Sequence, residues 1–136
     1  MGQYHFLCNL DKKEFVNPHR LGDGLKVWEQ CASGPGGIGS ACVALLACPT
    51  PRGGGDLERC EAYGRWHGDR VALVGDYAEN SDLPPVDQAS GIYGGLHSPS
   101  SGWKDISEIV EKLLSKELGI TYTGDGWRGR TFHNIS

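Results

Sequence analysis

The sequence lacks the features that mark several common functional classes. Its five cysteines include no Cys-x-x-Cys pair, its longest basic run is Lys12-Lys13, and its longest apolar run is Ala41–Cys48. Without such pairs, a disulfide framework or a zinc knuckle is not expected, and a reducing cytoplasm is favoured. An apolar run this short cannot cross a bilayer, and a net charge of −4 does not suit a nucleic-acid binder. The sequence therefore predicts a cytoplasmic protein with neither a membrane nor a nucleic-acid partner.

Catalytic and cofactor motifs are missing as well. No two of the five histidines lie three or four residues apart, so no helix face would offer a histidine pair to a metal ion. The chain has neither the Gly-x-Ser-x-Gly turn of many hydrolases nor a Walker phosphate loop. We therefore expect no metal and no cofactor, and we favour a non-catalytic domain over an enzyme.

Glycine, in contrast, is abundant, with 21 glycines among 136 residues. This composition predicts many turns and close backbone contacts rather than long regular elements. The length is typical of one domain, which we place at residues 1–136. Two stretches rich in proline, glycine or serine, 49–56 and 79–102, are predicted to be flexible loops within it.

The apolar pattern predicts an α+β fold built mainly from antiparallel hairpins. Alternation over Tyr4–Leu10 and Glu14–Val16 indicates a first hairpin, and residues 120–132 indicate a last one. Between them, Tyr63–Ala78 has the pattern of a hairpin that turns at His67-Gly68. Its second strand is apolar on both faces, which predicts a central strand covered on both sides.

One long amphipathic helix is predicted at 105–118, where apolar residues recur every three or four positions and Gly119 follows. Shorter helices are expected at Leu25–Cys31, with Asp23 as the N-cap, and at Ala41–Ala47. We expect the long helix and one or two short ones to pack on the sheet.

Two blocks of residues carry a resemblance. The first is the opening Met-Gly-Gln-Tyr with Asn-Leu-Asp-Lys-Lys-Glu at 9–14, Pro-His at 18–19 and Gly-x-Gly-Leu-Lys-x-Trp-Glu at 22–29. The second is Trp-x-Gly-Asp-Arg at 66–70 with Gly-Asp-Tyr at 75–77. This arrangement resembles a group of small, uncharacterised microbial and phage-borne proteins. The resemblance implies a widespread stand-alone domain of a kind that mobile elements carry, and it transfers neither an activity nor catalytic residues.

The first candidate ligand site is the stretch Gly34–Ser40. It contains Gly-x-Gly-x-x-Gly before a predicted helix, where free amides can hold a phosphate, here those of Gly36, Gly37, Gly39 and Ser40. The residues before it are predicted to be helical, whereas a dinucleotide-binding fold requires a strand there. A glycine-rich linker between two helices is therefore the alternative interpretation.

A second glycine-containing segment also suggests a nucleotide. Ala89–Gly94 resembles the phosphate-gripping loop of macrodomains, which bind ADP-ribose, but the paired asparagines that macrodomains carry early in the chain are missing. The alternative interpretation is a glycine-rich loop tip. Together with Gly34–Ser40, this segment keeps nucleotide binding open.

The other candidate ligand site is a cluster of charged residues. His19 and Arg20 precede Asp23 in a stretch with two glycines, and Arg70 follows the predicted turn of the central hairpin. A cationic pair in a flexible loop suits an anionic ligand, and the alternative is solvated surface charge. The expected partner is a small anionic molecule, such as a nucleotide, or another protein. Assembly into a homo-oligomer is left open.

The alternative function is that of a small hydrolase that uses acid–base or metal chemistry. Its side chains would be His19 or His67 acting with Asp69 or Asp76. Two or more of these groups would then have to lie within hydrogen-bonding distance in a concave pocket.

Overall fold

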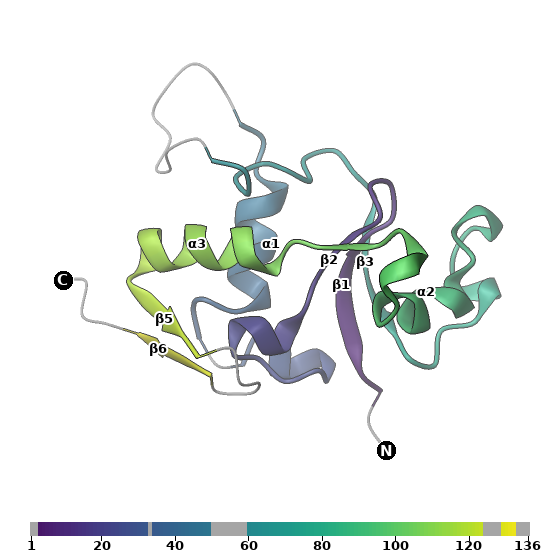
Figure 1. Cartoon of the computed structure of the whole chain (residues 1–136), viewed down its shortest axis with the longest axis horizontal. Coiled ribbons are helices and arrows are strands. Elements are labelled where there is room, and N and C mark those ends of the chain that lie inside the picture. The colour runs from purple at the N-terminus through teal and green to yellow at the C-terminus, as the bar shows by residue number, and fades with distance from the viewer. Residues whose placement is uncertain (1–2, 33, 50–59, 124–128, 133–136) are drawn as a thin grey trace.

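The computed structural model describes residues 3–32, 34–49, 60–123 and 129–132 (Figure 1). Its helices are α1 (Ile38–Leu46), α2 (Ala89–Leu96) and α3 (Ser107–Leu118). Its strands are β1 (His5–Asn9), β2 (Glu14–Val16), β3 (Val71–Gly75), β4 (Lys104–Asp105), β5 (Ile120–Tyr122) and β6 (Arg130–Phe132). Short 3₁₀ helices are η1 (Pro18–Leu21), η2 (Val27–Gln30), η3 (Asn80–Asp82), η4 (Pro85–Asp87) and η5 (Pro99–Ser101). In these ranges, none of the helices combines the length and the apolar character needed to span a bilayer.

Four of the strands form one mixed sheet in the order β3-β1-β2-β4. β1 runs antiparallel to both of its neighbours, with Leu7 opposite Val16 of β2 and opposite Leu73 of β3. β4 pairs with β2 in parallel, and β5 and β6 form a separate antiparallel pair. The architecture is therefore α+β, as the sequence predicts. The first predicted hairpin is confirmed, and so is the described part of the last one.

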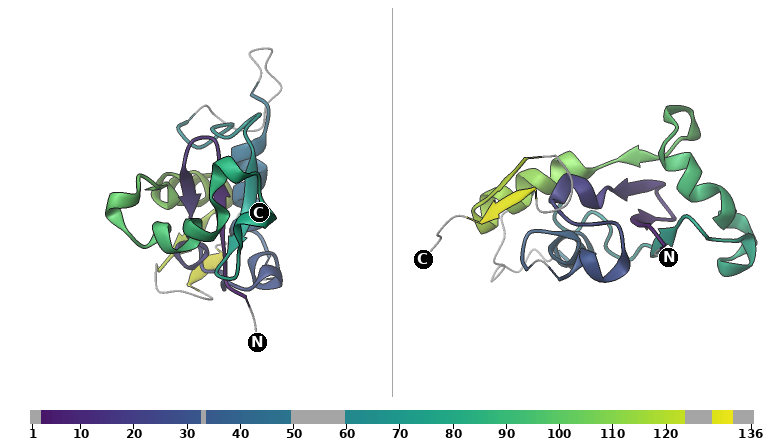
Figure 2. Two further views of the ribbon diagram at one scale, coloured as in Figure 1. Left: turned by 90° about the vertical axis from the view of Figure 1, so that its right-hand side faces the viewer. Right: turned by 90° about the horizontal axis from the view of Figure 1, so that it is seen from below.

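Helices cover both faces of the four-stranded sheet, because successive side chains of a strand point to opposite sides and both sets are apolar. Phe6, Cys8 and Phe15 project from one face and pack against Ile92 and Leu96 of α2. The opposite face is covered by α1 and α3, and the buried cluster between them and the sheet includes Leu7, Val16, Leu21 and Trp66. Figure 1 shows the sheet between α1 and α3 on one side and α2 on the other, and Figure 2 shows α2 and the β5–β6 pair at opposite ends of the molecule.

A buried polar contact joins the sheet to the segment before β3. Glu14 on β2 accepts hydrogen bonds from Trp66 Nε1 at 2.8 Å and from Arg65 Nε at 3.0 Å. Burial raises the pKa of the Glu14 carboxyl, but the hydrogen bonds from Arg65 and Trp66 outweigh burial and hold this pKa below its usual value. Glu14 is therefore ionised at neutral pH, and its charge is paired, as a buried charge requires.

α3 confirms the helix that the apolar spacing predicts at 105–118, although its first helical residue is Ser107. Asp105 Oδ1 accepts a hydrogen bond from Ser107 N at 2.8 Å, which satisfies one of the free amides at the helix start. Gly119 ends the helix with a φ of 66°, a left-handed conformation that glycine adopts without steric cost.

The hairpin predicted over Tyr63–Ala78 does not form. Only its second strand exists, as β3, and this strand pairs with β1 at the edge of the sheet rather than lying at the centre. The preceding residues bond instead to the end of α1, where Gly64 N donates to Ala44 O at 2.8 Å and Trp66 N to Leu45 O at 2.9 Å. Because a helix leaves its last carbonyls unpaired, this tertiary contact outweighs the local hairpin pattern.

The stretch 79–102 is not without regular structure, since it contains η3, η4, α2 and η5. Ala89, Ile92 and Leu96 are spaced for one helix face, and all three are buried. Three of the eight residues of α2 are glycine, which weakens helix propensity, so this helix depends on packing against the sheet. The segment that resembles a macrodomain loop is the first part of α2. Of the other predicted loop, 49–56, only residue 49 is described.

The helix predicted over Leu25–Cys31 is reduced to η2, and Asp23 does not cap it. Trp28 in this segment is 78% exposed, so the segment buries no continuous apolar face. The helix predicted at Ala41–Ala47 is confirmed as α1, but it begins earlier, at Ile38.

Candidate functional site

Asp23 binds the helix N-terminus that the sequence predicts as an anion site. Its Oδ2 accepts a hydrogen bond at 2.7 Å from the backbone N–H of Ile38, the first residue of α1. A side chain is excluded at Gly37, because a Cβ there would collide with the Asp23 carboxylate. A negative charge at this position pairs the free amide and favours the helix dipole. The place expected for a phosphate therefore holds the chain's own carboxylate.

Arg130 on β6 ties this carboxylate to the glycine-rich stretch. One of its guanidinium nitrogens, Nη1, lies 2.6 Å from Asp23 Oδ1 and 2.8 Å from Leu21 O. The same side chain donates to the carbonyls of Pro35 and Gly34, each at 3.0 Å. Arg130 is a residue whose role the sequence does not reveal, because its partners lie more than ninety positions away.

The turn before α1 is also bonded from within. Tyr122 on β5 donates its hydroxyl to Gly36 O at 2.5 Å, and Gly36 N donates to Ser40 Oγ at 2.8 Å. Burial raises the pKa of the Tyr122 hydroxyl, which keeps it protonated as a donor. Gly39 and Ser40 line an apolar groove of about 330 Å³ between α1 and α3, together with Val43. These contacts match the alternative interpretation of a structural linker between two elements.

His19 and Arg20 lie in η1, which begins after Asn17. The Arg20 guanidinium binds Glu111 of α3 in a bidentate pair, with Nε–Oε1 at 2.9 Å and Nη2–Oε2 at 3.1 Å. The backbone N–H of His19 donates to Asn17 Oδ1 at 3.0 Å, and His19 Nδ1 is buried without a hydrogen-bond partner in the described part of the chain. The expected cationic pair therefore serves the contact between η1 and α3.

The side chains of the hydrolase alternative are not brought together. Asp69 accepts hydrogen bonds from Asn9 Nδ2 at 2.8 Å and from Lys12, and the Lys12 bond is the main cause of the lowered pKa of Asp69. Asp76 accepts from the backbone N–H of Tyr4 at 3.1 Å, and His67 is exposed. Across the described ranges, no hydrogen bond or ion pair joins any two of His19, His67, Asp69 and Asp76. In the same ranges, no three His, Cys, Asp or Glu side chains are placed to hold a metal ion.

A hollow of about 460 Å³ lies between α2 and the turn that joins β1 to β2. The start of β3, η4 and the segment before β4 complete its walls, and Figure 1 shows α2 beside the sheet at this point. We call it the α2 hollow. Its lining residues are Leu10, Asp11, Lys13, Arg70, Val86, Asp87, Gln88, Gly91, Ile92, Gly95, Ser101 and Trp103.

One side of the α2 hollow is apolar. It is formed by Ile92, by Trp103 and by two glycines, Gly91 and Gly95, that lie one turn apart on α2. A Cβ at Gly91 would meet no atom within 4 Å, so open space faces the helix backbone there. The Cδ1 edge of the Trp103 indole lies 3.7 Å from the Cβ position at Gly95. An aromatic side chain beside a gap of this kind suits a planar ligand.

Arg70 binds two carboxylates at the polar side of the α2 hollow. Its Nε and its backbone N–H donate to the two oxygens of Asp11, each at 2.9 Å. Its two terminal nitrogens donate to the two oxygens of Asp87, each at 3.0 Å. The backbone hydrogen bond of Arg70, followed by its side-chain bond, lowers the pKa of Asp11, and Asp87 and Asp11 raise the pKa of Arg70. Each of the four carboxylate oxygens therefore accepts one hydrogen bond from Arg70.

Three polar groups that line the α2 hollow remain without a partner. In the described residues, no hydrogen bond or ion pair involves the Lys13 ammonium, the Gln88 carboxamide or the Trp103 indole N–H. Lys13 and Gln88 also have φ angles of 55° and 49°, and no other non-glycine residue described here has a positive φ. A left-handed conformation costs such a residue about 1–2 kcal/mol and is concentrated at binding and catalytic sites. Both non-glycine residues with a strained backbone therefore line this hollow.

Comparison of the chain with protein-family models, with curated proteins and with solved structures finds no match. The lining chemistry of the α2 hollow is therefore what indicates a function. Of the predicted ligand-binding residues that the structure describes, Arg70 lines this hollow, and so do Gly91 and Ile92 of the segment Ala89–Gly94. A signal for Lys13 was present, because a short turn between two strands often needs a left-handed residue at its end, where glycine or asparagine is usual.

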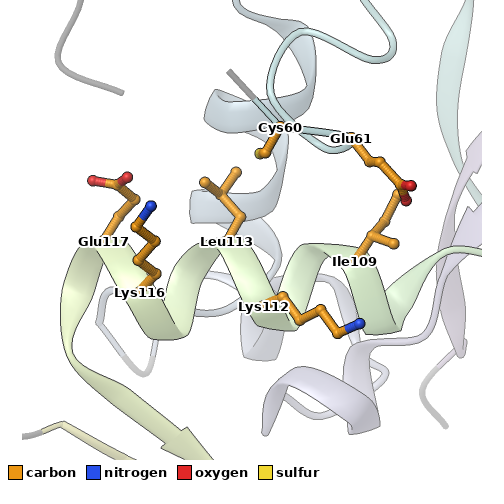
Figure 3. Close-up of a pocket in the computed structure, with 7 residues that line it drawn as sticks. All are labelled: Cys60, Glu61, Ile109, Lys112, Leu113, Lys116 and Glu117. Atoms are coloured by element: carbon orange, nitrogen blue, oxygen red, sulfur yellow. The ribbon is translucent and has the colours of Figure 1, made fainter. Parts of the chain in front are cut away.

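Another hollow, of about 250 Å³, lies on the far side of α3 from the β5–β6 pair (Figure 3). Ile109 and Leu113 form its apolar floor, with Cys60 and Glu61 on the facing segment. Lys112 also lines it, and its ammonium pairs with Glu108 at 3.5 Å. In the part of the chain that the structure describes, this hollow is lined neither by residues with a strained backbone nor by a set of hydrogen-bond donors without a partner. We therefore give priority to the α2 hollow.

Proposed function

We propose that this protein is a non-catalytic binding protein whose α2 hollow holds a small, planar, anionic molecule. The observation that carries the proposal is an imbalance of hydrogen-bonding groups. Arg70 donates to every carboxylate oxygen of Asp11 and Asp87, whereas Lys13, Gln88 and Trp103 keep donor groups without a partner among the described residues. A lysine ammonium and an indole N–H donate and cannot accept, so the open groups favour a ligand rich in acceptors.

The dimensions and shape of the α2 hollow agree with this ligand class. About 460 Å³ is within the range of small-molecule sites, and the Trp103 ring supplies a face on which a planar group can stack. The Lys13 ammonium supplies the positive charge that an anionic group needs. A nucleotide combines a flat base with a charged phosphate, and it is therefore the first ligand to test. Cytoplasmic location is part of the same proposal.

The test is a thermal-shift screen of the full chain against nucleoside monophosphates, ADP-ribose, cyclic dinucleotides and aromatic carboxylates, followed by titration calorimetry. A ligand at a hundred times its Kd adds about 2.7 kcal/mol to the free energy of unfolding, which corresponds to a shift of several degrees. Lys13→Asn removes the ammonium while keeping a residue that tolerates a positive φ, so the variant is expected to fold and to lose the shift.

Lys26→Asn is the matched control, because Lys26 is exposed and does not line the α2 hollow. This variant is expected to bind as the wild type does. The proposal is wrong if no ligand of these classes raises the melting temperature, or if Lys13→Asn and Lys26→Asn bind the ligand equally well.

A further inference from the structure

The α2 hollow has as many negative side chains as positive ones. Among its described lining residues, the charged side chains are Asp11, Asp87, Lys13 and Arg70, so their charges cancel. The backbone hydrogen bond of Arg70, followed by its side-chain bond, holds the pKa of Asp11 below its usual value, so Asp11 is ionised at neutral pH. Asp87 accepts at both oxygens from the Arg70 guanidinium, as an ionised carboxylate does. A ligand that enters this hollow therefore meets no net positive charge.

Two further lysines lie close in the chain to the lining residues, but neither adds a free positive charge to the hollow. Lys12 lies in the turn between β1 and β2, and its ammonium pairs with Asp69. Lys104 is opposite Glu14 where β4 pairs with β2, so both side chains leave the face of the sheet that is turned away from α2. In the described lining of the hollow, the cation without a carboxylate partner is therefore the Lys13 ammonium.

We infer that the ligand of the α2 hollow carries a single negative charge, as a carboxylate or a phosphate diester does, an inference that rests on the proposed function. Removing an ion from water has a free-energy cost that grows with the square of its charge, whereas its attraction to one ammonium grows only in proportion to the charge. Going from one charge to two therefore raises the cost about fourfold and the attraction about twofold. Lys13 alone compensates a single charge better than the two charges of a phosphate monoester.

Asp11 and Asp87 add to this discrimination, because ionised carboxylates accept hydrogen bonds and have none to donate to an anion. Their repulsion of an anionic group also grows with the charge of that group. Arg70 does not offset this repulsion in full, because it carries one charge and pairs with two carboxylates. The residues around Lys13 therefore disfavour a second negative charge.

The start of α2 does not supply the amides that would favour a doubly charged phosphate. Helix N-termini bind phosphate through free backbone N–H groups. At α2, Ser90 N donates to Asn80 Oδ1 at 3.1 Å, and Gly91 N donates to Gln88 O at 2.9 Å. Two of the first three amides of this helix are therefore used within the chain.

The test is titration calorimetry of the full chain with probes that share a planar group and differ in charge. Naphthalene-1-carboxamide is neutral, 1-naphthoate carries one charge, and 1-naphthyl phosphate carries two at about pH 8, because the second pKa of a phosphate monoester is about 6. Adenosine, the methyl ester of adenosine 5′-monophosphate and adenosine 5′-monophosphate itself form a second series. The two series distinguish a carboxylate from a phosphate diester. In the series that binds, we expect the singly charged probe to bind at least about tenfold more tightly than the other two.

Two variants separate the effect of charge from the effect of shape. Lys13→Asn removes the ammonium, so the affinity for the singly charged probe should fall to that for the neutral one. Asp11→Asn removes one negative charge from the hollow, so the doubly charged probe should gain more affinity than the singly charged one, and the ratio of their dissociation constants should fall at least about threefold. Circular dichroism checks that this variant is folded, which the 39% exposure of the Asp11 side chain favours.

Glu108→Gln is the matched control for Asp11→Asn, because Glu108 is exposed on α3 and does not line the α2 hollow. This variant should keep the wild-type ratio. The inference is overturned, while the proposed function stands, if the doubly charged probe binds at least as tightly as the singly charged one, or if Asp11→Asn and Glu108→Gln give the same ratio. A neutral probe that binds as tightly as the singly charged one would overturn both, and so would the failure of both series to bind.

Discussion

The carboxylate of Asp23 and the guanidinium of Arg130 form a nearly fully buried ion pair, with exposed side-chain fractions of 1% and 7% and 2.6 Å between Oδ1 and Nη1. The pair joins the residues after η1 to β6, and through Ile38 N it also holds the start of α1. The glycine-rich stretch beside this pair has the sequence pattern of an anion site, and its backbone does approach a negative charge. The charge belongs to Asp23.

We predict that Asp23→Ala lowers the free energy of unfolding by about 3–5 kcal/mol, because it removes one partner of a buried ion pair and the acceptor of the Ile38 N–H. Glu111→Ala is the control, since it also removes the acidic partner of an arginine. Arg20, the partner of Glu111, is 37% exposed, so this loss is expected to be about 1 kcal/mol or less. Urea denaturation of both variants measures the difference. Equal losses would contradict the assigned role of the Asp23–Arg130 pair.

We predict that Lys13→Gly and Gln88→Gly each raise the free energy of unfolding by about 1 kcal/mol, because glycine adopts a positive φ without the steric cost that Lys13 and Gln88 bear. Lys12→Gly is the control. Lys12 has no positive φ and pairs with Asp69, so its replacement is expected to destabilise the fold. Thermal melting decides the sign. If Lys13→Gly stabilises the chain but loses the ligand-induced shift, the strain at this residue is maintained for binding.

We predict that Gly91→Met blocks ligand binding in the α2 hollow and leaves the fold intact, because a Cβ at Gly91 meets no atom within 4 Å. Gly94→Met is the control. Gly94 also lies on α2 with open space at its Cβ position, but it does not line the hollow. Both variants should keep or raise the melting temperature, since methionine favours a helix more than glycine does. Calorimetric titration should show weaker ligand binding to Gly91→Met than to Gly94→Met. Equal affinities would mean that the ligand binds elsewhere.

We predict that Glu14 makes the free energy of unfolding depend on pH. Its pKa in the folded chain is below the usual value near 4.5, so its contribution to stability is complete above that value and is lost as the pH falls through the folded pKa. Glu14→Gln should therefore unfold at a lower temperature than the wild type at pH 7, with the gap narrowing below about pH 4. Melting curves at pH 7, 5 and 3 test this. A gap of constant size would show that the charge of Glu14 does not contribute.

The elements that the sequence predicted correctly are those with a strong local pattern. The apolar spacing of α3 ends at Gly119, and the alternation of β1 and β2 encloses a short polar turn. The patterns that predict these elements repeat within a few residues of the chain. α2 was missed because its glycines hide a regular spacing of Ala89, Ile92 and Leu96, and the helix forms where the sheet covers that face.

Two errors have a common physical cause. Tyr63–Trp66 has a strand pattern, yet its backbone pairs the unfilled carbonyls at the end of α1. Asp23 is predicted as the N-cap of a helix at Leu25, but its carboxylate accepts instead from the N–H of Ile38, the first residue of α1. In both cases the residue type indicates the kind of contact, and the packing of distant segments selects the partner.

By itself, the sequence determined the α+β class, the first hairpin and the place of the long helix, because their signals repeat within a few residues. Only the tertiary structure decided that Lys13, Gln88 and Trp103 border one hollow, and that Arg70 joins Asp11 to Asp87 beside them. These residues come from separate segments that meet when α2 packs on the sheet. No local sequence pattern predicts this contact, because it depends on the burial of apolar faces that are far apart in the chain.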